Sequence, residues 1–201
     1  MLFMSQSGLT DAQRQAEWEQ WYLAHLRAML TVNSIDSAQR FTLIQGDNAP
    51  SLALYTIATP EVFQDPTYLR IRGMGEWLPL IDRRHYRRNL FAGLDTAPDV
   101  PAADVLLVAD REQPEPALAG IAWAWLEAVA LDRSPRYRGV AVVSHTDALR
   151  AHGAGVASYR PVTARLTKMD DTTPVEEGGD DGQGTAAGGV QLQQCRRGRI
   201  P

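Results

Sequence analysis

The sequence predicts an α+β protein with two ferredoxin-like halves in one chain. Three observations support this fold class. Residues 17–30 carry a helical apolar pattern, residues 1–95 contain segments in the order β-α-β-β-α-β, and a partial copy of that order follows. We therefore expect a first half at 1–95, an incomplete second half of β-α-β-β type at 102–168, and a disordered C-terminal tail at 169–201.

The first predicted helix begins at a cap on Thr10 or Asp11 and runs to about residue 32. Its aromatic and aliphatic side chains recur at helical spacing, so they would share one face and be buried. His25 lies in the middle of that face, one turn from Trp21 and one turn from Met29, and it is the only group there that titrates near neutral pH. The stripe comprises Trp18, Trp21, Tyr22, His25, Leu26, Met29 and Leu30.

The rest of the first half alternates apolar segments with turn residues. Residues 46–50 predict the turn of an antiparallel hairpin. Thr59-Pro60-Glu61 predicts a helix start, because it combines a capping hydroxyl, a proline at the first helical position and an acid near the positive helix end. The expected strands are 2–4, 38–44, 52–58 and 83–91, and the second helical segment ends near residue 72.

The second half repeats this order after a turn-rich segment at 95–101. We expect a strand at 105–108, a helix at 116–131, and a hairpin formed by 137–144 and 156–166. The stretch 176–189 is rich in glycine and has almost nothing to bury, so it cannot offset the entropy lost on ordering. This composition is the reason for predicting a disordered tail.

Composition and charge argue against several classes of protein. The formal net charge of −4 over 201 residues gives no basic field for nucleic acid. The single cysteine, Cys195, excludes an internal disulfide, and scattered acids and histidines lack metal-ligand spacing, so we expect no metal and no cofactor. No apolar stretch reaches the ~18 residues of a membrane span. No secretory signal is visible, so a cytoplasmic location is the default expectation.

The basic run from Arg83 to Arg88 could form an anion patch. On a strand, however, alternate side chains point to opposite faces, so the charge would be split between them. A solvated edge strand or an oligomer rim is therefore favoured over a nucleic-acid site.

Four segments carry a family resemblance: Trp21-Tyr22-Leu23-Ala24-His25-Leu26, Ser37-Ala38-Gln39-Arg40-Phe41, Leu52-Ala53-Leu54-Tyr55, and Thr59-Pro60-Glu61-Val62 leading to Tyr68. They resemble the EthD-like family of the dimeric α/β-barrel superfamily, in which the first helix carries a W-Y-x-x-H-like motif and an arginine–aromatic pair opens the next strand. The resemblance covers about residues 1–95. It implies two ferredoxin-like sheets that form a barrel, from two chains or from two halves of one chain, with a pocket between sheet and helices.

The resemblance also implies a small-molecule enzyme that acts on an aromatic or polyketide-like substrate by proton transfer or cofactor-free oxygenation. His25 would be the general acid/base, because a histidine pKa near ~6.5 allows proton exchange at neutral pH. Trp21 and Tyr22 would shape an aromatic-lined cavity. Arg40 or Tyr55 could orient an oxyanion or a phenol.

The alternative is a non-catalytic barrel protein that binds a small hydrophobic ligand or acts only in assembly. His25 would then be a core histidine bonded to a backbone carbonyl, and the aromatic side chains would fill the interface between helix and sheet. The two alternatives differ in whether His25 meets an open cavity or is sealed by Trp21 and Met29. The expected partners are a small hydrophobic or aromatic molecule and, in a dimeric barrel, a second copy of the chain in a homodimer.

Overall fold

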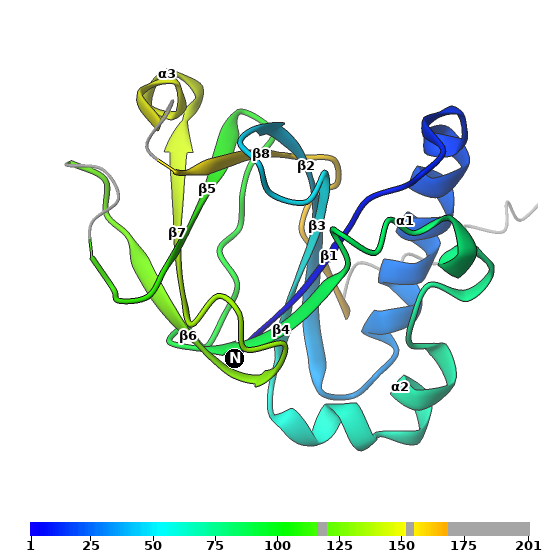
Figure 1. The fold of residues 1–201 in the computed structure, drawn as a ribbon. Helices are drawn as coiled ribbons and strands as arrows, with labels where there is room; N and C mark the ends of the chain where they lie inside the picture. The colour runs from blue at the N-terminus through cyan, green and yellow to red at the C-terminus, as the bar shows by residue number, and fades with distance from the viewer. Residues whose placement is uncertain (116–119, 152–154, 169–201) are drawn as a thin grey trace, which may run out of the picture.

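The structure is a computed structural model that describes residues 1–115, 120–151 and 155–168; the tail expected at 169–201 lies outside these ranges. Its main feature is a closed antiparallel barrel of eight strands, with a short ninth strand beside β2 (Figure 1). The order around the barrel is β3-β1-β4-β6-β7-β5-β8-β2, and the pairing of β2 with β3 closes the ring. The strands are β1 (Leu2–Ser7), β2 (Ile35–Gln45), β3 (Ser51–Ile57), β4 (Arg87–Ala92), β5 (Asp104–Arg111), β6 (Ala124–Leu131), β7 (Tyr137–Ser144), β8 (Ala157–Pro161) and β9 (Leu166–Thr167).

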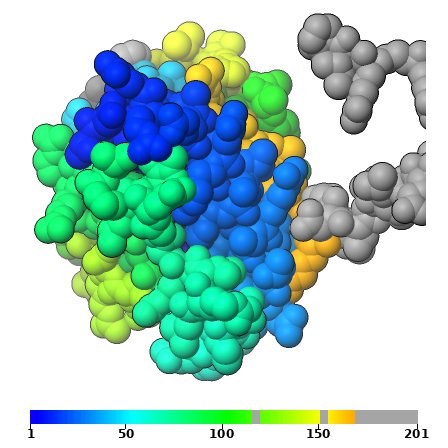
Figure 2. Space-filling model, turned by 90° about the vertical axis from the view of Figure 1, so that its right-hand side faces the viewer, coloured from blue at the N-terminus to red at the C-terminus, as the bar shows by residue number. Residues whose placement is uncertain are grey.

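Most of the helical residues cover one side of the barrel. The long helix α1 (Gln15–Leu30) packs on the outer face of β1, β2 and β3, and short helical segments between β3 and β4 continue this cover. Figure 2 shows both parts side by side on one face of the molecule. The short segments are η2 (Pro60–Gln64), α2 (Pro66–Ile71) and η3 (Gly75–Leu80); η1 (Ala12–Arg14) precedes α1, and α3 (His145–Ala148) with η4 (Leu149–Ala151) follows β7. Among the described segments, no helix has the length and apolar character needed to cross a membrane.

This architecture shows that the expected fold class is wrong. Most of the regular structure is sheet, and the strands form one closed β-barrel instead of ferredoxin-like sheets covered by helices. The pairs β4–β6 and β2–β8 join the parts of the chain before and after residue 100. One chain therefore completes the barrel, and the expectation of a dimeric α/β barrel is wrong as well.

The helix expected at 116–131 is a clear local error. Residues 124–131 form β6, which pairs with β4 on one side and β7 on the other, while 116–119 lie outside the described residues. A short apolar run fits the period of a helix and that of a buried strand almost equally well. The tertiary context decides between them, because β6 provides hydrogen-bond partners for two strand edges that would otherwise stay unpaired.

The strand order repeats within the chain. The first four strands lie side by side in the order β2-β3-β1-β4, and the next four lie in the order β6-β7-β5-β8. If the strands of each set are numbered along the chain from one to four, both sets have the spatial order 2-3-1-4. The connections differ, since α1 joins β1 to β2, whereas the connection from β5 to β6 contains no helix in its described residues.

Strand β1 forms a wall between two buried clusters. Leu2 and Met4 point into the barrel, while Phe3 and Ser5 face α1. The barrel interior is filled by side chains from all eight of these strands, Phe41, Leu54, Phe91 and Tyr159 among them, so it is a packed core. The layer between this wall and α1 is the second core, and it contains the aromatic stripe of the helix.

Candidate functional site

A small polar cavity lies inside the second core, between α1 and the outer wall of the barrel. Strands β1, β3 and β4 form its floor, and α1 and the connection from α2 to η3 form its sides. Its volume is about 20 Å³, roughly the space that one water molecule needs. The polar side chains that line it include Ser5, Tyr22, His25, Tyr55, Tyr68 and Arg88.

His25 is held in this cavity by aromatic contacts. Its ring stacks on Trp21, with the ring centroids 4.9 Å apart and the planes 9° from parallel, and it meets Tyr22 edge to face at 5.9 Å. Burial lowers the pKa of His25 from 6.5 to about 4, because the charged imidazolium loses its hydration there. At neutral pH His25 is therefore neutral, with one ring nitrogen that donates a hydrogen bond and one that accepts.

Three tyrosine hydroxyls stay protonated beside His25. Burial raises the pKa of Tyr22 to about 12, and hydrogen bonds to Ser5 and Tyr55 offset part of that shift. Burial also raises the pKa of Tyr55 and of Tyr68, although the positive charge of Arg88 acts against the shift at Tyr68. The cavity thus offers hydroxyl donors in a region of low dielectric, where each hydrogen bond is stronger than in water.

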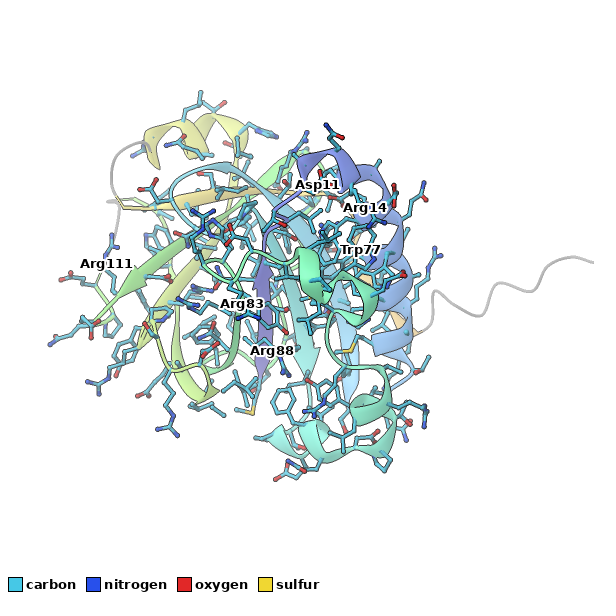
Figure 3. The ribbon with its side chains drawn as sticks, turned by 45° about the vertical axis from the view of Figure 1, so that its right-hand side comes forward. Asp11, Arg14, Trp77, Arg83, Arg88 and Arg111 are labelled. Atoms are coloured by element: carbon cyan, nitrogen blue, oxygen red, sulfur yellow. The ribbon has the colours of Figure 1, made fainter. Side chains whose placement is uncertain are left out.

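Arg88 brings a positive charge to the same place. This half-buried side chain donates a hydrogen bond from Nη2 to the Tyr68 hydroxyl, and its guanidinium lies 5.6 Å from the centre of the Phe3 ring. Among the described residues, no carboxylate oxygen forms an ion pair with Arg88. Figure 3 labels Arg88 near the centre of the view, below Arg83.

The segment that closes the cavity is anchored at its two ends. Asp65 caps α2, since its carboxylate accepts hydrogen bonds from the backbone N–H groups of Thr67 and Tyr68. At the other end Arg14 lies over the ring of Trp77, 4.5 Å from its centroid, and ties η3 to the start of α1 (Figure 3). Between these anchors Arg72, Gly73 and Met74 line the cavity, and Gly73 has a φ of +93°, which favours glycine. The described part of this connection has no regular structure between α2 and η3.

The structure brings three of the five sequence-predicted site residues together, since His25, Tyr22 and Tyr55 all line the cavity. Trp21 does not line it and instead stacks on the His25 ring. Arg40 contacts the Tyr22 ring at 4.3 Å but is bonded elsewhere: it donates to the Glu19 carboxylate and, 3.2 Å away, to Ser51 Oγ. Burial lowers the pKa of Arg40 to about 10, so it stays charged and Glu19 supplies its counter-charge.

The residues that sequence reasoning missed come from strands, from a loop and from the short helix α2. Ser5, Tyr68, Tyr86 and Arg88 all line the cavity. The basic run from Arg83 to Arg88 held a partial signal for Arg88. Alternate side chains of a strand point to opposite faces, so in a central strand some of these arginines must point away from solvent. The sequence alone did not show that β4 lies between β1 and β6.

A larger cavity of about 670 Å³ lies at one mouth of the barrel. Four arginines and four carboxylates line it, so its charges balance. Two of these arginines already have carboxylate partners: Arg138 binds both oxygens of Asp110 at 2.7 and 2.8 Å, and Arg84 binds Asp82. This mouth therefore favours no particular ligand charge, whereas shifted pKa values cluster around His25, as they often do at functional sites.

The geometry offers no metal centre, since no three His, Cys, Asp or Glu side chains lie close enough together to hold an ion in the part of the chain that the structure describes. The chemistry available at the His25 cavity is hydrogen bonding and proton transfer. No family model, curated protein or solved structure matches this chain, so the comparisons assign it to no family and lend no support to the EthD-like resemblance.

Proposed function

We propose that the protein binds a small aromatic molecule in the His25 cavity and transfers a proton to or from it. One observation carries this proposal: the hydroxyls of Tyr22, Tyr55 and Tyr68 converge with a neutral histidine inside an otherwise apolar core. Phenylalanine would fill the same space without a polar group to satisfy, and buried polar groups carry a cost unless they are hydrogen-bonded. A cluster of this kind suits the recognition of a ligand oxygen better than it suits packing.

The cluster has the groups that abstraction of a proton next to a carbonyl requires. The free ring nitrogen of His25 takes the proton. The electron pair of the broken C–H bond forms a C=C bond, and the carbonyl electrons move onto the ligand oxygen, so that the ligand becomes an enolate. The tyrosine hydroxyls donate hydrogen bonds to that oxygen as its charge develops. The negative charge then raises the pKa of the adjacent His25, which makes the histidine a better base as the reaction proceeds.

Binding of an aromatic ring requires the cavity to expand, because about 20 Å³ holds no more than a water molecule. The segment most suited to move is the connection at residues 72–74. Arg72 is exposed, and a Cβ placed on Gly73 would meet no atom within 4 Å, so there is free space around this connection. In the proposed function this segment moves outward when the ligand enters and closes over it afterwards.

Deuterium exchange tests the proposal without knowledge of the natural substrate. Phenylacetone is an aromatic ketone with benzylic protons next to its carbonyl, and NMR in D₂O follows their replacement. We expect the intact protein to accelerate this exchange, and His25→Gln to lower the accelerated rate by ~10²–10⁴-fold, the usual contribution of general acid–base catalysis. His145→Gln is the matched control, because His145 is exposed on α3 at the opposite side of the barrel.

The second candidate is a non-catalytic role for the same cluster, and the water-sized cavity favours it. In that case His25 only packs against Trp21, and phenylacetone exchanges at the same rate with and without the protein. Equal rates for the intact protein and for His25→Gln would also rule out His25 as the base.

A further inference from the structure

We propose that the ligand of the His25 cavity is an aromatic carboxylate and that Arg88 binds its carboxylate group. This inference rests on the proposed function, because it specifies the class of molecule that enters the same cavity. It adds a charge requirement that the proton-transfer chemistry by itself does not impose.

The charges around the cavity all have one sign. The residues that line it include two arginines, Arg72 and Arg88, and neither an aspartate nor a glutamate. The remaining polar groups are hydroxyls and the imidazole of His25, which can donate hydrogen bonds to an anion. Both arginines act on the Tyr68 hydroxyl and favour its anionic form, so their positive potential reaches the interior of the cavity. A carboxylate would be attracted there, and an ammonium group would be repelled.

Arg88 differs from the buried arginines of this protein in its partners. Arg40 is paired with Glu19, and Arg138 is paired with Asp110. The guanidinium of Arg88 donates a hydrogen bond to the neutral Tyr68 phenol, although it has five N–H donors, and the nearby Asp132 carboxylate accepts its hydrogen bond from the backbone N–H of Arg88. A partly buried charge is stabilised by a counter-charge, and a carboxylate matches the guanidinium in a bidentate geometry. An anionic ligand would supply that counter-charge.

The strand register places Arg88 on the correct face for this role. On β4, Arg88 pairs across the sheet with Ser5, which lines the His25 cavity. The neighbouring Arg87 pairs with Gln6, and both line the barrel mouth instead. Two adjacent arginines therefore serve different cavities, and Arg87 is a natural control for Arg88.

Benzoate and benzamide test the inference, because they share the ring and differ in charge at pH 7. The probe is the side-chain NMR signal of His25 in the ¹⁵N-labelled full chain, assigned with His25→Gln. We expect benzoate to bind at least about tenfold more tightly than benzamide, because one charge-assisted hydrogen bond contributes that much affinity. We expect Arg88→Met to weaken benzoate binding about 10–100-fold and to leave benzamide unchanged, whereas Arg87→Met retains the preference.

Each other outcome contradicts a defined part of the argument. Equal affinities for benzoate and benzamide would overturn the charge requirement and leave the proposed function standing. A preference that survives in Arg88→Met would show that Arg88 does not bind the carboxylate. If Arg88→Met does not fold, Arg88→Lys replaces it and must keep the preference for benzoate. If phenylacetone, benzoate and benzamide all leave the His25 signal unchanged, the proposed function falls together with this inference.

Discussion

The low pKa of His25 makes the stability of the protein depend on pH in a defined direction. Burial lowers this pKa from 6.5 to about 4, so the unfolded chain binds a proton between these values while the folded protein does not. The stabilisation from a neutral His25 is therefore complete above about pH 6.5 and disappears as the pH falls to about 4. Over this whole pH range the free energy of unfolding falls by roughly 3 kcal/mol. Between pH 7 and pH 5 it falls by about 2 kcal/mol.

Urea unfolding at pH 7 and pH 5 measures this effect when the intact protein is compared with His25→Gln. The variant has no imidazole at this position, whereas the other histidines and the carboxylates contribute equally to both proteins. We expect the intact protein to lose about 2 kcal/mol more than the variant between the two pH values. Parallel losses would show that His25 has the same pKa in the folded and unfolded states, and our account of its burial would be wrong.

Three further substitutions test the framework around the site by the free energy of unfolding. Glu19→Gln should destabilise the protein by about 1–3 kcal/mol, because buried Arg40 loses its counter-charge, while Glu17→Gln in an exposed pair should change stability by less than about 0.5 kcal/mol. Gly139→Ala should cost about 1–3 kcal/mol, since the new Cβ would lie 2.9 Å from two tryptophan rings; an unchanged stability would refute this packing. Asp65→Ala should cost about 1 kcal/mol through loss of the α2 cap, and a neutral result would contradict the two hydrogen bonds seen there.

Elements with a strong local signal could be predicted from the sequence. The stripe at 17–30 lies entirely within α1, although the helix begins at Gln15 and not at the predicted cap on Thr10 or Asp11. The strands expected at 38–44 and 52–58 overlap β2 and β3. The strand expected at 83–91 begins only at Arg87, because the Asp82 carboxylate binds both the backbone N–H and the guanidinium of Arg84 and holds a turn. The closure of the barrel had no local signal, since it depends on pairings between strands far apart in the chain.

The candidate site shows the same division between local and long-range information. His25 and Tyr22 could be predicted because helical spacing alone places them on one buried face. Arg88 and Ser5 reach the same cavity from two neighbouring strands, and only the register between β1 and β4 brings them there. Arg40 was expected in the pocket, but its pairing with Glu19 on α1 directs its charge elsewhere.

The two sets of four strands share their order but differ in what covers their outer faces in the described part of the chain. In the first set of four strands, α1 adds a second layer of side chains outside the barrel, and the polar cavity lies within this layer. In the second set, Trp123 and Trp125 pack directly on the wall, so close to Gly139 that even a methyl group would overlap their rings. Direct contact between these rings and Gly139 leaves no room for a larger side chain at that point of the wall. Ligand binding should therefore respond to changes in the first 95 residues, whereas changes around Gly139 should affect stability alone.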